Sequence, residues 1–146
     1  MIEGFNLTKE LIRFEKGFQN WEDAIKASSE GLLKQGYIEP SYVQSMIDSV
    51  HEYGPYIVIA PNIAMPHARP EAGSNKVGFA VMLCEEPVSF SNALEHQARL
   101  LVTLSCVNAD THLMMLQALV GVLGDDEKLQ QILNAKTKEE ILEIFK

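Results

Sequence analysis

The run ARLLVTLSCV at residues 98–107 decides the fold class, because it is short, continuous and almost wholly apolar. Two further runs of this kind precede it in the chain, YIVIA at 56–60 and VGFAVML at 77–83. Short apolar runs rich in β-branched residues are typical of strands that are covered on both faces. The middle of the chain is therefore predicted to form a block of buried strands.

Before this block, two stretches carry apolar residues at helical spacing. Asn20 is a candidate N-cap for the first helix, which Gly36 ends. The second helix is expected to begin at about Pro40, a favoured first-turn residue, and to end at Gly54. The segment LTKELIRFE at 7–15 fits either an opening strand or a helical turn.

After the block, the spacing of leucines and valines predicts a helix from about Thr111 that Gly124 closes. Two shorter amphipathic helices are expected at 126–135 and 138–146. Helices that bracket buried strands indicate an α/β layered fold. A length of 146 residues fits a single domain over 1–146.

Two segments between the predicted elements are expected to be loops. The first is EEPVSFSNALEHQ at 85–97, which is largely polar. The second is IAPNIAMPHARPEAG at 59–73, in which Pro61, Pro66 and Pro70 restrict the backbone. A stiff loop loses little conformational entropy when it orders, so this segment is suited to holding one side chain in place.

Composition and charge disfavour several classes of protein. A net charge of −8 disfavours nucleic acid and anionic membrane surfaces as partners. No apolar run approaches the roughly 20 residues of a membrane span, and MIEGFNLTKE at 1–10 does not resemble a secretory leader. We expect a cytoplasmic protein without direct membrane insertion. Cys84 and Cys106 lie in apolar runs, so both are expected to be buried thiols.

His67 is the first candidate functional residue, since it stands in the stiff loop directly after Pro66. Arg69, two residues further on, supplies a forked donor that suits phosphate or carboxylate oxygens. A passive histidine in a proline-rich turn explains the same pattern. The residues alone leave both interpretations open.

His112 is the second candidate. It follows Asn108 and Asp110, either of which is a possible N-cap for the helix that starts near Thr111. The first turn of a helix attracts anions through its free N–H groups and its dipole. A surface histidine is the alternative interpretation. If both candidates lie at one edge of the sheet, His67 and His112 form a two-histidine site.

Other residues predict no further chemistry. His51 is expected to be a helix-terminal histidine, and His96 an exposed loop residue without a role. The chain has no glycine-rich phosphate loop, HExxH pair or GxSxG motif, and a hydrolase with His67 as its base would lack a nucleophile. A two-histidine metal site would lack a third ligand. We therefore expect neither a cofactor nor a metal.

The residues around His67 resemble a known active-site signature. The stretch EYGPYIVIAPNIAMPHA at 52–68 is similar to that of type-2 enzyme IIA domains, the mannitol/fructose class, of the bacterial phosphoenolpyruvate-dependent sugar phosphotransferase system. Each term of the signature is met, by Glu52, Ile59, Ala60, Ile63, Ala64, Met65, Pro66, His67 and Ala68. The fuller run, GPYIVIAP followed by AMPHARPE, looks most like the ascorbate-type IIA proteins.

The resemblance implies both a fold and a function. The fold would be a mixed central β-sheet of about five strands, flanked by helices on both faces. The chain would be a cytosolic phosphocarrier that accepts a phosphoryl group from HPr and passes it to a IIB component, with the membrane IIC component as an indirect partner. An ascorbate-like sugar would be the substrate. The alternative function is that of a regulatory, nitrogen-type IIA protein that signals its phosphorylation state by binding other proteins.

The resemblance also implies roles for individual residues. His67 would be the phosphorylated nucleophile, and His112 would stabilise the phosphoryl group. Glu52 is the signature acid, with no role assigned to it. Members of the family commonly carry arginine directly before this acid, where this chain has His51. Arg69 is therefore a candidate for the missing phosphate contact.

Phosphoryl transfer makes a specific demand on the nucleophilic histidine. One ring nitrogen must attack, so a hydrogen bond at the other nitrogen should fix the tautomer. We expect a backbone carbonyl near the loop to accept that bond. A helix N-terminus and a second histidine would stabilise the added negative charge. The site should be shallow, because two different proteins must reach the same nitrogen.

Overall fold

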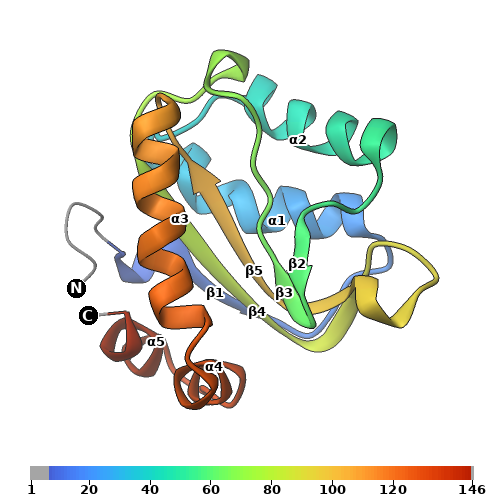
Figure 1. The fold of residues 1–146 in the computed structure, drawn as a ribbon, viewed down its shortest axis with the longest axis vertical. Coiled ribbons are helices and arrows are strands. Elements are labelled where there is room, and N and C mark those ends of the chain that lie inside the picture. Colours follow the sequence, from blue (N-terminus) through green and yellow to red (C-terminus); the bar gives the residue numbers. More distant parts are fainter. Residues whose placement is uncertain (1–6, 146) are drawn as a thin grey trace.

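A five-stranded sheet between two helical layers forms the centre of the computed structural model, which describes residues 7–145 (Figure 1). Residues 1–6, which belong to the stretch that does not resemble a leader, lie outside the described residues. So does residue 146, at the end of the last predicted helix. Between residues 7 and 145, no helix is both long and apolar enough to cross a membrane.

The sheet is mixed, as predicted. Its strands are β1 (Ile12–Glu15), β2 (Val58–Ala60), β3 (Asn62–Ala64), β4 (Gly78–Ser89) and β5 (Gln97–Ser105). Their order across the sheet is β1-β4-β5-β3-β2. Strand β1 is parallel to β4 and β3 is parallel to β5, whereas the β4–β5 and β2–β3 pairs are antiparallel.

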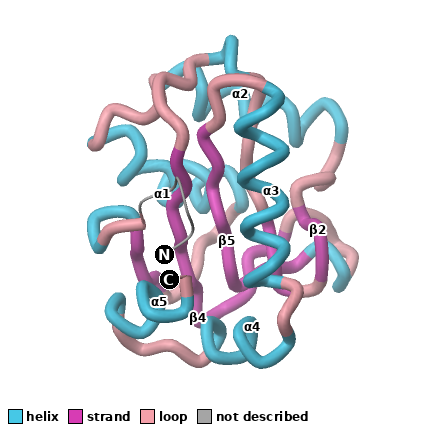
Figure 2. Tube along the Cα trace, turned by 60° about the vertical axis from the view of Figure 1, so that its left-hand side comes forward, coloured by secondary structure: helices cyan, strands magenta, loops and turns pink. Residues whose placement is uncertain are grey.

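Helices cover both faces of this sheet, which confirms the predicted α/β fold (Figure 2). One layer contains α1 (Trp21–Lys34) and α2 (Pro40–Tyr53). The other contains α3 (Ala109–Leu123), α4 (Asp126–Leu133) and α5 (Lys138–Ile144). Asn20 caps α1 as predicted, because its side chain accepts a hydrogen bond from the Asp23 N–H group.

The alternation of side chains along β4 explains why both faces need a cover. Phe79 and Leu83 belong to the hydrophobic cluster that includes residues of α3, α4 and α5. Met82 and Cys84 point the other way, into the cluster with α1 and α2. A strand buried on both faces has no polar side, so its sequence is a continuous apolar run rather than an alternating one.

The segment at 56–64 differs from the prediction. The run YIVIA was expected to be a strand covered on both faces, but only Val58–Ala60 pairs, as the edge strand β2, and Ile59 is 50% exposed. Strand β3 lies within the segment that is predicted to be a loop. Three residues between Pro61 and Met65 are too few for a strand pattern to stand out, so only pairing with β5 reveals β3.

Strand β4 also extends further than predicted. The segment 85–97 was expected to be a loop, but Val88 and Ser89 pair with Ala98 and Gln97 after a register shift. Exposed residues 85–87 interrupt the apolar pattern there and conceal the continuation of the strand.

The opening segment at 7–15 combines both predicted alternatives, a helical turn and a strand. A 3-10 turn (Lys9–Leu11) leads directly into β1.

The turn between β2 and β3 depends on Asn62. Its φ of 70° lies in the left-handed region, which asparagine and glycine tolerate better than other residues. We predict that Asn62→Ala lowers the free energy of unfolding by about 1 kcal/mol, whereas Asn62→Gly changes it by less than about half of that. Urea unfolding measures both values, and equal losses in the two variants would contradict this role of the backbone conformation.

Candidate functional site

The loop that leaves β3 is fastened to its surroundings at successive residues. The Met65 N–H group donates to the Ile57 carbonyl at 2.8 Å. The Pro66 carbonyl accepts a hydrogen bond from the Leu104 N–H group in β5 at 3.0 Å. The Ala68 N–H group donates to the Tyr42 hydroxyl in α2 at 3.1 Å. His67 therefore stands between two anchored residues, and its backbone has little freedom.

The imidazole of His67 is held in one tautomer. Its Nδ1 lies 2.7 Å from the backbone carbonyl oxygen of Met65. A carbonyl oxygen only accepts hydrogen bonds, so Nδ1 carries the proton and Nε2 keeps its lone pair. The expected hydrogen bond to a backbone carbonyl is therefore present, and Nε2 is the nitrogen that can act as a nucleophile.

The start of α3 brings the second histidine to this loop. Asn108 is the N-cap and forms a reciprocal capping box with Thr111, so Asp110, the other predicted cap, lies within the first turn instead. The His112 N–H group makes a helical hydrogen bond to the Asn108 carbonyl at 3.1 Å. The ring centroids of His67 and His112 are 5.4 Å apart. The two predicted histidines thus lie side by side.

The surroundings of His112 favour its neutral form. Partial burial lowers its pKa below 6.5, and the nearby His67 lowers the pKa further by charge repulsion. Because folding lowers this pKa, the unfolded chain binds the proton more tightly than the folded chain does. The contribution of His112 to stability is therefore lost as the pH falls through 6.5 toward the folded pKa.

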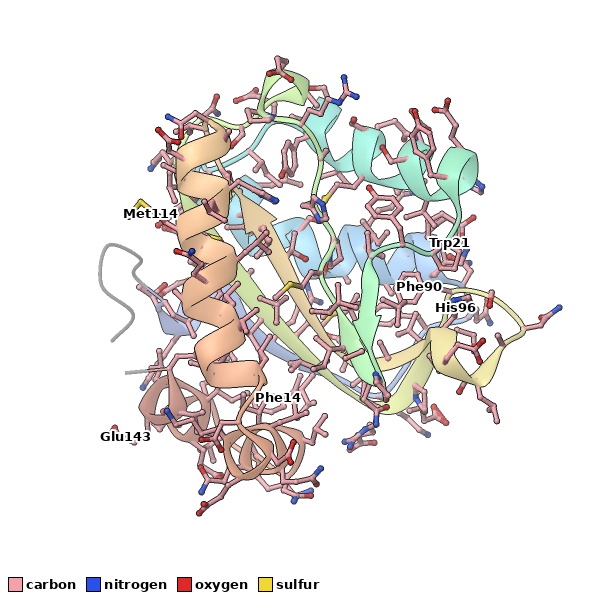
Figure 3. The ribbon with its side chains drawn as sticks, in the orientation of Figure 1. Phe14, Trp21, Phe90, His96, Met114 and Glu143 are labelled. Atoms are coloured by element: carbon pink, nitrogen blue, oxygen red, sulfur yellow. The ribbon has the colours of Figure 1, made fainter. Side chains whose placement is uncertain are left out.

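A cavity of about 810 Å³ opens beside the two histidines. Asn108, the N-cap of α3, contributes to its lining together with Arg69, Tyr53 and Tyr56. Tyr53 and Tyr56 are 69% and 44% exposed, so the walls of the cavity belong to the protein surface. Met114, two residues beyond His112, is exposed on α3 and does not contribute to the lining (Figure 3).

Arg69 lines this cavity, whereas His51 does not. Arg69 is exposed, and no residue between 7 and 145 forms an ion pair with it. Ser49 and Tyr53 line the cavity from one side of α2, whereas His51 faces α1. There, His51 Nε2 is 3.3 Å from Glu22 Oε2, and its ring lies 4.8 Å from that of Trp21, which is labelled in Figure 3.

Two further residues singled out from the sequence, Glu52 and His96, lie outside the cavity lining. Glu52, the signature acid, is exposed near the end of α2 and does not contribute to the cavity. His96 was predicted to be exposed but is half-buried in the turn between β4 and β5, because its Nδ1 lies 2.6 Å from Ser91 Oγ, within hydrogen-bond distance. Both predicted buried thiols are confirmed, and burial raises the pKa of Cys84 and of Cys106 to about 11. Cys106 nevertheless borders the cavity.

Sequence patterns did not identify Tyr42, which fixes the loop. Its side chain is 1% exposed, and its hydroxyl donates to the Leu104 carbonyl at 2.7 Å. Burial raises the pKa of Tyr42 to about 12. Tyr42 precedes Met46 by four residues on the buried face of α2, so its burial was detectable from helical spacing. The hydrogen-bond partners of Tyr42 were not detectable in this way, because Ala68 and Leu104 are distant in sequence.

We predict that the pKa of His112 rises in a His67→Gln variant but stays below 6.5. The substitution removes the repulsion by His67, whereas burial, which is the larger cause of the shift, remains. NMR titration of the imidazole signals measures the change. His96→Gln serves as the control and should leave the His112 titration as it is in the wild type. An unchanged or lower pKa in His67→Gln would show that the two rings do not interact.

Comparison with known proteins identifies the family. Residues 5–146 match the model of "Phosphoenolpyruvate-dependent sugar phosphotransferase system, EIIA 2". The ascorbate-specific EIIA component of Escherichia coli is 33% identical over 135 residues, which cover 92% of this chain and 88% of that protein. The mannitol-specific cryptic enzyme IIA component of the same species is 39% identical over 127 residues, which cover 87% and 86%.

Solved structures agree with this result. The solution structure of the cryptic mannitol IIA component of Escherichia coli has a TM-score of 0.88 at 34% identity and covers 99% of this chain and 97% of its own. A second, the complex of mannitol enzyme IIA with phosphorylated enzyme IIB from Escherichia coli, has a TM-score of 0.85 at 28% identity and covers 97% of each chain. The chain therefore belongs to the EIIA 2 family of the phosphoenolpyruvate-dependent sugar phosphotransferase system.

Proposed function

We propose that this protein is a phosphocarrier that accepts a phosphoryl group from HPr on His67 and passes it to a IIB component. The observation that carries the proposal is the fixed tautomer of His67, with Nδ1 on the Met65 carbonyl and Nε2 available beside His112. In the transfer, the bond between phosphorus and HPr breaks as the bond to Nε2 forms. In the second transfer, the bond between phosphorus and Nε2 breaks as a bond to the IIB component forms, which returns His67 to its unphosphorylated form.

The residues around Nε2 suit the charge that arrives with the phosphoryl group. The transition state of phosphoryl transfer is loose, so the protein contributes mainly position and electrostatic stabilisation. His112 is neutral at physiological pH, because its pKa is lowered, and a neutral imidazole carries one N–H donor for a phosphoryl oxygen. The N-terminus of α3 adds its dipole and free N–H groups from the same side.

Arg69 is the proposed cationic contact to the phosphoryl group. It lines the cavity that contains both histidines, and its forked donors match phosphoryl oxygens. His51 is engaged with Glu22 and Trp21 on the other side of α2. The charge that arginine commonly supplies at that position in the family is thus supplied by Arg69 in this chain. We assign no role to Glu52.

The residues that wall the cavity are evidence that the donor and the acceptor of the phosphoryl group are proteins. Tyr53, Tyr56 and Val107 line it and are all exposed, and aromatic residues are enriched where proteins bind each other. A relative that is 28% identical has been solved with its phosphorylated IIB partner, which supports a IIB partner for this chain. The membrane IIC component would then act only through IIB.

For the substrate, we propose an ascorbate-like sugar. The run from Gly54 to Glu71 resembles the ascorbate-type proteins, and an ascorbate-specific relative is 33% identical over 92% of this chain. Relatives named for mannitol are also similar, so the IIB partner must be tested directly. The nitrogen regulatory IIA protein from Neisseria meningitidis is 18% identical and shares the fold alone, which gives the regulatory alternative no separate support.

Phosphorylation by phosphoenolpyruvate, enzyme I and HPr tests the central proposal. We expect the wild type to gain one phosphoryl group in intact-mass spectrometry and His67→Gln to gain none, because glutamine offers no nucleophilic nitrogen. His96→Gln is the matched control and should be phosphorylated like the wild type. A normal mass gain in His67→Gln would overturn the assignment of the nucleophile.

Transfer from the phosphorylated protein to purified IIB proteins tests the partner and the supporting residues. We expect an ascorbate-type IIB to be phosphorylated faster than a mannitol-type IIB. His112→Ala should slow transfer by about 100-fold and Arg69→Gln by about tenfold, since each removes a donor to the phosphoryl group. Lys128→Gln, which removes a surface charge on α4, is the control. Wild-type rates in either site variant would remove that residue from the mechanism.

A further inference from the structure

We infer that Tyr42 is a positioning residue for phosphoryl transfer, because its hydroxyl holds the backbone that carries His67. The inference rests on the proposed phosphocarrier function and adds a residue outside the family signature. Tyr42 is buried in α2 and does not line the cavity. Its effect on the reaction must therefore pass through the loop rather than through a contact with the phosphoryl group.

The hydroxyl of Tyr42 uses both of its hydrogen-bonding functions. It donates to the Leu104 carbonyl at 2.7 Å and accepts from the Ala68 N–H group at 3.1 Å. This arrangement requires a neutral hydroxyl, and burial keeps it neutral by raising the pKa of Tyr42 to about 12. Phenylalanine at this position would keep the ring but leave both backbone groups without this partner.

Leu104 anchors the chain on both sides of His67. Its N–H group donates directly to the Pro66 carbonyl at 3.0 Å, and its carbonyl is linked through the Tyr42 hydroxyl to Ala68. The residue before His67 and the residue after it are thus fastened to a single residue of β5. Without the hydroxyl, only the Pro66 side of this clamp remains.

The same strand also leads to His112. Strand β5 ends at Ser105, and α3 begins at Ala109, so few residues separate Leu104 from the second histidine. The clamp therefore ties the loop of His67 to the segment that supplies His112. A displacement of about 1 Å between groups that act together can cost on the order of 100-fold in rate. Loss of the clamp should consequently slow transfer without removing a reacting group.

The test compares Tyr42→Phe with Thr103→Val. Thr103 adjoins Leu104 in β5, and its hydroxyl donates to Ser28 Oγ at 2.8 Å between two buried side chains. Both variants therefore remove a buried hydroxyl from the same region, but only Tyr42→Phe loosens the loop. Urea unfolding checks that both variants fold, and phosphorylation by HPr is followed under saturating and limiting concentrations of phosphorylated HPr.

We expect Tyr42→Phe to lower kcat for phosphorylation by at least about tenfold while KM for phosphorylated HPr changes less than about twofold. Thr103→Val should retain the wild-type kcat. In ¹⁵N NMR spectra, the wild-type His67 ring should be the tautomer with a proton on Nδ1, whereas Tyr42→Phe should give averaged tautomer signals. The Ala68 amide of the wild type should exchange slowly with solvent.

Several outcomes would overturn the inference. Equal kcat values for Tyr42→Phe and Thr103→Val would do so, as would an unaltered His67 tautomer in Tyr42→Phe or rapid exchange of the wild-type Ala68 amide. Failure of the proposed function is distinguishable from failure of this inference, because the wild type itself would then accept no phosphoryl group. The tautomer and the amide exchange would still decide, in that case, whether Tyr42 positions His67.

Discussion

Two parallel strands that end at the same edge of the sheet are the constraint on which the rest of this structure depends. Because β3 is parallel to β5, the chain leaves both strands in the same direction. Residues 65–69 follow one strand and residues 106–112 follow the other. His67 and His112 meet for this reason, with ring centroids 5.4 Å apart, and the hydrogen bond from the Leu104 N–H group to the Pro66 carbonyl ties the loop of His67 to β5.

The electrostatics of the site contrast with those of the whole chain. A net charge of −8 disfavours the approach of a free anion and favours a basic partner. At the cavity, however, Arg69, the N-terminus of α3 and the imidazole of His112 provide donors for an anion. This combination suits a phosphoryl group that arrives attached to a protein better than it suits free phosphate in solution.

Much of the fold follows from local sequence because its signals are local. The cap at Asn20, the apolar spacing in α2 and the long buried runs of β4 and β5 each lie within a few residues of the structure that they predict. Strand β3 was missed because three residues among prolines carry no periodicity of their own. Its pairing with β5 is a long-range contact that the local pattern does not contain.

In the candidate site, too, the features that depend on neighbouring residues were predictable, and those that depend on long-range contacts were not. His67 and its hydrogen bond to Met65 lie in one loop, so the need for a fixed tautomer pointed to a carbonyl nearby. The distance between His67 and His112 depends on the sheet, and the orientation of His51 toward Glu22 depends on the packing of α2 against α1. Tyr42 shows the limit most clearly, since helical spacing indicates its burial but not the partners of its hydroxyl.

The order of the strands has a consequence for how the molecule behaves at high concentration. The two long strands, β4 and β5, are interior, whereas the edges are β1 with four residues and β2 with three. An exposed strand edge is a template for pairing with another chain, and short edges offer few groups for it. The molecule can therefore present the exposed tyrosines of its cavity to other proteins while its sheet gives little opportunity for aggregation through its edges.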